Sequence, residues 1–337
     1  MSNLTRLSPE NPHWRTFVAA HATSPFQSAE WLETLTSAYG LTAQVVVLID
    51  NEGKLKAGLP LIRSAMPLRK RWTCLPFSDV VDSIATSSTT REELLVAIAK
   101  NCQPDPIIIR AHTSAPGWTS RQVGTVQTID VSDGAAGVLR DAGSNAKRGV
   151  KRASKETSLG AAVVSSREEF LGPCYHLTVR SRRRLGVPTQ PRRYWSRVWD
   201  LHEQGFAVTI GVYRDGALVA SGVFLLGGSH AVYKYGASES SAWKLRPNHL
   251  MFSAAFDRLA ERGARTMDFG LTDLANVSLR EFKATWGGEE ITASFSATDP
   301  CLLPKSTEPS RLLAAAIRHT PVLTGRAIGA LAYRYMA

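Results

Sequence analysis

Hydrophobic residues recur with two different periods along this chain, and the alternation predicts a protein of mixed helices and strands. After Ser28, a favoured N-cap residue type, Trp31, Leu32 and Leu35 recur at helical spacing, so a helix is predicted there. The β-branched run 45–49 is typical of a buried strand. The other elements predicted in the first 130 residues are a hairpin turn at 50–53, a strand at 54–62, a helix at 91–100, and strands at 106–110 and 125–131.

A second cycle of elements begins near Ala135. It comprises helix 138–155, strand 161–164, helices 168–184 and 192–203, strands 206–213, 218–226 and 230–236, helix 248–262 and strand 266–269. Both halves follow one α+β plan with antiparallel hairpins. We therefore predict two domains, 1–134 and 135–303, followed by a basic amphipathic tail, 304–337.

Size and charge narrow the functional classes. The 337 residues are 44% hydrophobic, which suits two medium domains with real cores. No apolar run approaches the roughly 18–20 residues of a membrane helix, and the polar first twelve residues do not resemble a signal peptide, so a cytoplasmic location is expected. The four cysteines form no CxxC pair and the histidines have no HExxH spacing, so no metal is predicted.

The net charge of +11 favours an anionic partner, which leaves nucleic acid, a phosphate-rich donor and a membrane surface open. In the tail, Arg311, Arg318, Arg326 and Arg334 alternate with apolar residues, a pattern typical of helices that lie on a membrane. Peripheral contact with the inner face of the membrane is therefore a second expectation. The simpler alternative is a soluble protein with a basic surface.

A basic loop precedes the predicted helix at 248–262. Asn248 is the predicted N-cap, and Lys244 and Arg246 lie just before it. Free backbone N–H groups at a helix start bind phosphate or carboxylate, helped by the helix dipole. His249 fits this donor-binding loop, or a structural role, better than the role of a base. The alternative is an ordinary capped helix with surface cations.

Two further groups of cations suggest anion binding. Arg180, Arg182 and Arg183 belong to a run without any acidic residue between Phe170 and Trp199. Arginine's planar fork suits phosphate, so this run is a candidate phosphate-binding site. Lys147, Lys151 and Lys155 share one helix face by their i, i+4 spacing, with Arg148 and Arg152 beside it. In both cases a solvated basic face is the alternative.

The closing segment contains the candidate catalytic residues. Lys283, next to Phe282, is placed to stabilise the oxyanion of a tetrahedral acyl-transfer intermediate, although a surface lysine after a core aromatic fits equally well. Asp268 and Asp273 flank a Phe-Gly-Leu-Thr turn, where they would orient an amine, act as a base or simply form the turn. Asp79 presents the same choice in an earlier loop, between lining a cleft and closing a strand.

These segments, in this order, resemble the Fem-type (FemAB-like) branch of the GNAT superfamily of acyltransferases. Residues 24–31 are similar to the family's Phe-Leu-Gln-Ser-x-x-Trp start, and 145–155 to its basic interdomain helix. The run 180–186 resembles its Thr-x-x-Arg-x-Gly element. Asp268-Phe269-Gly270, together with Phe282-Lys283 and Gly287, resembles its closing block. The resemblance covers roughly residues 20 to 300.

The resemblance implies two tandem GNAT-like domains with splayed mixed sheets and a cleft between them. It implies transfer of an acyl or aminoacyl group to an amine of a cell-envelope or polysaccharide precursor, such as a peptidoglycan precursor. Acyl-CoA or aminoacyl-tRNA would be a co-substrate, with no tightly bound cofactor. Phe282 and Lys283 would contact the acyl end of the donor, and the arginine run would bind phosphate of an anionic or lipid-linked acceptor.

Two departures from the family pattern leave the donor open. No coiled-coil arm is visible, which weakens the case for tRNA, and residues 243–248 replace the usual GNAT pyrophosphate loop without a glycine, which weakens the case for CoA. The alternative function is a non-catalytic nucleic-acid or membrane-binding module with a degenerate GNAT fold.

Overall fold

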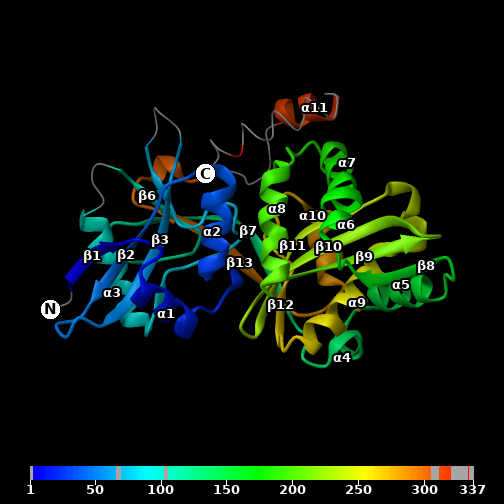
Figure 1. Ribbon diagram of the computed structural model, residues 1–337, viewed down its shortest axis with the longest axis horizontal. Coiled ribbons are helices and arrows are strands. Elements are labelled where there is room, and N and C mark those ends of the chain that lie inside the picture. Colours follow the sequence, from blue (N-terminus) through cyan, green and yellow to red (C-terminus); the bar gives the residue numbers. More distant parts are fainter. Residues whose placement is uncertain (1–2, 66–69, 102–104, 305–310, 320–332, 334–337) are drawn as a thin grey trace. The chain divides into compact units, whose positions relative to one another are not determined.

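The chain divides into two compact units of mixed helices and strands (Figure 1). The computed structural model describes residues 3–65, 70–101, 105–304, 311–319 and 333. Unit 1 comprises residues 1–124, 292–307 and 332–337, and unit 2 comprises 125–291 and 308–331. The predicted α+β class is confirmed.

The units are delimited differently from the predicted domains 1–134 and 135–303. Strands β7 (Thr119–Asp130) and β13 (Glu289–Ala297) each run from one unit into the other. Unit 1 is therefore discontinuous in sequence, because β13 returns to it after the whole of unit 2.

Unit 1 is built on a sheet with the strand order β1-β2-β3-β4-β6-β13. Its other strands are β1 (Asn3–Leu7), β2 (Ala43–Ile49), β3 (Leu55–Arg63), β4 (Trp72–Thr73), β5 (Ile84–Ala85), which pairs with β3, and β6 (Ile107–Ile109). β4 and β6 are parallel, and the other pairs are antiparallel. The predicted hairpin at 50–53 is confirmed, with Ala43 opposite Ile62.

The helices of unit 1 are α1 (Pro12–His21), the 3₁₀ turn η1 (Pro25–Gln27), α2 (Ala29–Tyr39) and α3 (Ser88–Asn101). The predicted N-cap is confirmed, since Ser28 Oγ accepts a hydrogen bond from Trp31 N at 3.1 Å. Trp14 and Phe17 of α1 pack with Val45 and Val47 of β2 in an apolar core.

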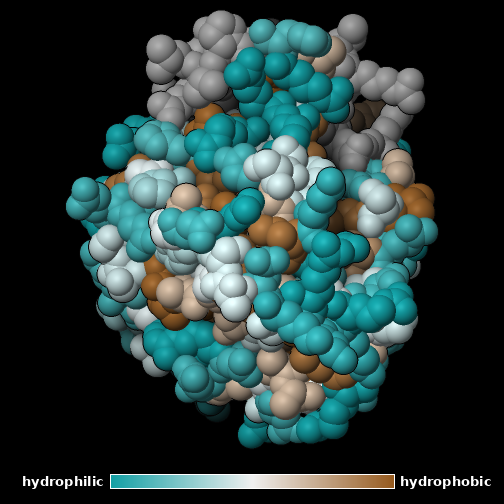
Figure 2. Space-filling model, turned by 90° about the vertical axis from the view of Figure 1, so that its right-hand side faces the viewer, coloured by the Kyte–Doolittle hydropathy of each residue, from teal (hydrophilic) through white to brown (hydrophobic). Residues whose placement is uncertain are grey.

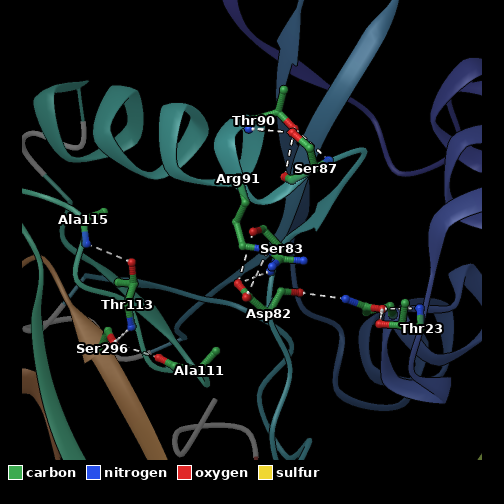
Figure 3. Close-up of polar contacts among 11 residues, drawn as sticks. Thr23, Asp82, Ser83, Ser87, Thr90, Arg91, Ala111, Thr113, Ala115 and Ser296 are labelled. Carbon is green, nitrogen blue, oxygen red and sulfur yellow. Dashed lines mark hydrogen bonds and ion pairs between the residues drawn. The ribbon is translucent and has the colours of Figure 1, made fainter.

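Side-chain bonds fasten the loops of unit 1 to this sheet (Figure 3). Asp82 accepts a hydrogen bond from Ser83 N at 2.6 Å and forms an ion pair with Arg91 of α3 at 3.2 Å. Gln27 Nε2 donates to the backbone oxygen of Asp82 at 3.1 Å. Ser296, on the part of β13 that belongs to unit 1, donates to Ala111 O at 2.7 Å.

In unit 2 the strand order is β7-β12-β11-β10-β9-β8. The strands are β8 (Leu159–Val163), β9 (Ala207–Arg214), β10 (Ala217–Gly227), β11 (His230–Ser238) and β12 (Thr266–Asp268). β11 and β12 are parallel, and the other pairs are antiparallel. β12 pairs with the first three residues of β11, and β11 then runs on to Ser238. This is the splayed geometry that the sequence predicted.

Helices cover both faces of this sheet (Figure 1). On one face, Phe252 and Phe256 of α9 (Pro247–Glu261) share an apolar core with residues of β9, β10, α4 (Gly134–Asp141) and α5 (Ser144–Ser154). On the other face, Trp195 of α8 (Arg192–Glu203) packs on Tyr235 of β11, with ring centroids 4.9 Å apart. α7 (Tyr175–Leu185) contacts β10 and β11.

Two predicted helices of unit 2 are wrong as continuous elements. The segment 138–155 breaks at Ala142, which has an extended backbone, and Gly143 N donates to Thr285 O at 2.8 Å. The segment 168–184 is interrupted by a π-helical turn, η2 (Phe170–Cys174), between α6 (Arg167–Glu169) and α7. Pro173 lies inside that turn and cannot supply a backbone N–H.

The closing segment also contains a helix that was not predicted, α10 (Val277–Ala284), so Phe282 and Lys283 are helical. In the predicted tail, α11 (Arg311–His319) forms, whereas Arg326 and Arg334 lie outside the described residues. Within the described ranges, no helix has the length and apolar character needed to cross a bilayer.

Candidate anion-binding site

A pocket of about 650 Å³ opens in unit 2 where α5, the first turn of α9 and α10 meet. Three arginines line it, Arg148, Arg152 and Arg246, against one carboxylate, Glu281. The other lining residues are Asn145, Gly149, His249, Ser278, Phe282 and Thr285. With three guanidinium groups to one carboxylate, the pocket favours an anionic ligand.

The start of α9 differs from the prediction. The N-cap is Arg246, in a left-handed conformation with φ 61°, and Pro247 occupies the first helical position. Asn248 is therefore not the N-cap but a residue of the first turn, and its side-chain nitrogen contacts Ser238 Oγ at 3.5 Å. The helix start still faces the pocket, because Arg246 and His249 both line it. The positive end of the helix dipole adds to the charge of the arginines.

A close approach of two helices forms the inner wall of the pocket. A Cβ atom on Gly149 of α5 would lie 2.2 Å from Cδ2 of His249, so only glycine allows this spacing. The His249 ring packs against Phe282 and Trp286, with centroids 5.5 and 5.6 Å away. Burial, with the charge of Arg246, lowers the pKa of His249 to about 4. His249 is thus neutral at pH 7 and offers the ligand a hydrogen bond and no charge.

Lys283 is buried and does not line the pocket. Its Nζ donates to Gly270 O and to Thr272 Oγ1, each at 2.6 Å. Asp268 accepts a hydrogen bond from Gly270 N at 2.7 Å. Lys283 therefore ties α10 to the turn that Asp268 shapes, while its neighbour Phe282 faces the pocket. Asp273 likewise accepts from Ala275 N at 3.0 Å.

The predicted arginine run lies near the segment that leads into the pocket, but outside its lining. Arg180 forms an ion pair with Glu239, and Arg184 Nη2 donates to Ser238 O at 3.1 Å. Arg182 Nε donates to Pro188 O at 2.8 Å, and Arg183 Nε to Arg318 O at 3.4 Å. The bonds of Arg180 and Arg184 attach α7 to residues 238–239, just before the 3₁₀ helix η3 (Ser240–Leu245), whose C-cap is Arg246. Lys244 is exposed on η3.

The face of α5 that lines the pocket is not the lysine face on which the sequence prediction was based. Lys147, Lys151 and Lys155 are exposed, and Lys147 Nζ donates to Arg140 O at 3.0 Å. Figure 2, which looks at the side where α5 and β8 lie in Figure 1, shows a largely hydrophilic surface. Arg148 and Arg152, one position further along, are the residues that line the pocket. The helical spacing in the sequence showed a lysine face and an arginine face on α5, but it did not show which of them lines the pocket.

Asp79 belongs to unit 1, in a loop with two non-glycine residues at positive φ, Leu75 at 42° and Phe77 at 68°. The backbone oxygen of Asp79 accepts from Arg110 Nε at 3.4 Å. Burial lowers the pKa of Arg110 to about 10, which leaves it protonated at pH 7. The loop is held in a strained form, and substrate contact by Asp79 stays a prediction.

Comparison with known proteins agrees with this architecture. Residues 140–283, which contain most of the pocket, match the family model for an acetyltransferase (GNAT) domain. A lipid II:glycine glycyltransferase of Staphylococcus haemolyticus is 36% identical over 83 residues, which are 23% of this chain and 19% of that protein. The chain thus matches about a fifth of the length of this curated relative.

Solved structures extend the fold comparison to most of the chain. FemX superposes with a TM-score of 0.69 at 17% identity, covering 87% of this chain and 96% of FemX. A tandem GNAT protein from the clavulanic acid biosynthesis pathway gives a TM-score of 0.53 at 12% identity, covering 89% of this chain and 99% of that protein. The predicted tandem GNAT fold is confirmed, and residues 140–283 match an acetyltransferase (GNAT) domain.

Proposed function

We propose that this protein is an N-acyltransferase that holds the anionic carrier of its donor in the pocket between α5, α9 and α10. The observation that carries the proposal is the convergence of Arg148, Arg152 and Arg246 at the first turn of α9, inside the GNAT domain. Acyl-CoA and aminoacyl-tRNA both carry phosphates that such a cluster binds.

The acceptor in this proposal is an amine of a cell-envelope or polysaccharide precursor, in line with the name of the glycyltransferase that matches part of the chain. The amine nitrogen attacks the donor carbonyl and a tetrahedral oxyanion forms. The C–S or C–O bond to the carrier then breaks, and the proton lost by the amine ends on the leaving sulfur or oxygen, which gives the amide and the free carrier. Phe282, on the pocket wall, packs against the acyl end of the donor, and His249 supplies a neutral hydrogen bond.

Lys283 has two separable roles in this scheme. The structure supports a positioning role, because its ammonium group bonds to Gly270 O and Thr272 Oγ1. Stabilisation of the oxyanion is the other. Lys283→Arg keeps the charge, so it should preserve more turnover than Lys283→Ala if charge matters. Equal turnover in Lys283→Ala and the wild type would remove both roles.

Thermal shift with acetyl-CoA, longer acyl-CoAs and aminoacyl-tRNA tests the donor site. A true donor at ~100 times its Kd should stabilise the protein by about 2.7 kcal/mol. Arg152→Gln should abolish most of this shift. Lys151→Gln is the matched control, because it removes one cation from the same helix outside the pocket lining.

Two results would count against the proposal. If Lys151→Gln and Arg152→Gln reduce the shift equally, the pocket is not the binding site. If a donor binds but no acceptor amine is acylated in its presence, the chain is a binding module with a GNAT fold.

A further inference from the structure

We propose that unit 2 carries a separate docking surface for an anionic lipid bilayer, formed by the C-terminal end of α7, by η3 and by α11. The docking surface consists of Arg183, Arg184, Leu185, Trp243, Lys244 and Arg318. It goes beyond the acyl-transfer proposal and does not depend on it.

Two large apolar side chains project from this surface. Leu185 is 58% exposed, the highest value among the large hydrophobic residues in the described ranges, and Trp243 is 49% exposed. Tryptophan and leucine beside basic residues are the side chains that enter the headgroup region of a bilayer. An exposed leucine contributes little to a purely electrostatic partner such as nucleic acid.

Trp243 is held firmly although half of it is exposed. The Arg184 guanidinium lies over its ring, 5.0 Å from the centroid, and Trp243 Nε1 donates to Ser238 Oγ at 2.9 Å. Arg184 Nη2 donates to the backbone oxygen of the same Ser238 at 3.1 Å. The indole is therefore a pre-oriented anchor that loses little side-chain entropy on insertion.

α11 contributes charge to the docking surface, not an inserted apolar face. Ala314 and Ile317 are buried, and a Cβ on Gly186, at the end of α7, would lie 2.8 Å from Ala314 Cβ. Arg318 Nη2 donates to Leu185 O at 3.4 Å, which places this cation beside the exposed leucine. The apolar residues Ala314 and Ile317 of α11 are thus buried within unit 2 and are not available to enter a bilayer.

The charges of the surface match an anionic bilayer. Arg183, Arg184, Lys244 and Arg318 give four cations, and the nearby carboxylate of Glu239 is paired with Arg180. Each basic residue close to an anionic membrane contributes about 1 kcal/mol, and the attraction fades at high salt. Exposed apolar groups within a basic rim favour lipid over nucleic acid.

Co-sedimentation of the 337-residue chain with vesicles tests the proposal. The wild type should bind phosphatidylglycerol–phosphatidylcholine vesicles more tightly than pure phosphatidylcholine vesicles. Leu185→Ser should weaken binding about tenfold, because it removes roughly half of a leucine's burial energy. Lys244→Glu should weaken it roughly thirtyfold at low salt, because it changes the charge by two.

Matched variants elsewhere serve as controls. Val163→Ser alters an exposed apolar residue on the edge strand β8, and Lys54→Glu reverses an exposed lysine in the β2–β3 turn. Both should bind vesicles like the wild type. If Lys244→Glu loses vesicle binding while Leu185→Ser binds like the wild type, the apolar side chains do not enter the bilayer and the proposal is overturned. The remaining contact would be purely electrostatic, and nucleic acid would satisfy it equally well. Equal binding to neutral and anionic vesicles, or no binding to either, would also overturn the proposal.

Discussion

The replacement Gly149→Ala tests the closest helix contact in the candidate site. In an isolated helix this change is favourable by about 0.8–1.0 kcal/mol, because alanine loses less backbone entropy than glycine. In this structure the added methyl group meets Cδ2 of His249 at 2.2 Å, whereas ordinary contacts begin at 3.4 Å. The ring must therefore withdraw by about 1.2 Å (3.4 minus 2.2), or α5 must move away from α9.

Neither movement is easy, because the His249 ring is packed on two sides. Phe282 meets it edge-on at 5.5 Å, and Trp286, which is 1% exposed, lies 5.6 Å away. Overpacking of this kind costs about 1–3 kcal/mol. After the gain in helix propensity is subtracted, we expect a net destabilisation of about 0–2 kcal/mol, or a fall in Tm of up to roughly 8 °C for a unit of this size.

A double-mutant cycle separates the gain in helix propensity from the cost of the contact with the His249 ring. Stability is measured by denaturant unfolding for the wild type, Gly149→Ala, His249→Ala and the double variant. When the ring is absent, Gly149→Ala should become neutral or stabilising, so the coupling energy should be about 1–3 kcal/mol. Gly160→Ala is the control, because its Cβ has no neighbour within 4 Å. Donor-induced thermal shifts of the same variants show whether the pocket closes.

The reasoning fails if Gly149→Ala stabilises the protein by the full propensity gain in both backgrounds. That result would mean that α5 and α9 are not held together at this point. The pocket between them would then have no fixed shape.

Three further predictions test other parts of unit 2. Burial lowers the pKa of His202 to about 4, below its usual value of 6.5, so between these pH values the unfolded chain binds more protons than the folded chain. The free energy of unfolding should therefore be constant above pH 6.5 and fall by up to about 3 kcal/mol towards pH 4. Denaturant unfolding of the His202→Gln variant should show a weaker pH dependence. Arg246→Gly relieves a left-handed backbone and should raise stability by about 1 kcal/mol while reducing donor-induced thermal shifts; lower stability would show that Arg246 is needed for folding. Gly288→Ala should destabilise by more than about 2 kcal/mol in denaturant unfolding, because Gly288 has φ 83° and the new Cβ would lie 2.2 Å from Thr128 O; a small effect would contradict this backbone contact.

Local chemistry predicted the elements whose signals are complete within a few residues. Ser28 caps α2, the turn at 50–53 joins β2 to β3, and the predicted helix at 192–203 agrees with α8. The break of the predicted helix 138–155 depends on a distant partner. Gly143 leaves the helical pattern to bond with Thr285 O, more than a hundred residues later, and no local pattern encodes that bond.

The site shows the same division between local and long-range information. The sequence identified the helix start near Arg246, the basic helix α5 and the pair Phe282–Lys283. It did not show that Arg148 and Arg152, not Lys147, face α9, because both faces of α5 carry the same charge. Nor did it show that Phe282 and Lys283 point to different environments. Their directions follow from α10, which was not predicted.

The separation of Phe282 from Lys283 connects the pocket to the splayed sheet. Phe282 belongs to the wall of the anion pocket, and Lys283 bonds to residues 270 and 272, just after β12 ends. β12 stops pairing with β11 at Asp268, so the turn at 268–273 begins where these two strands part. One helical step in α10 therefore links the pocket that we assign to the donor's phosphates with the turn that follows β12. In our proposal Phe282 packs against the acyl end of the donor, so damage to the turn that holds Lys283 should shift Phe282 and lower turnover more than donor affinity.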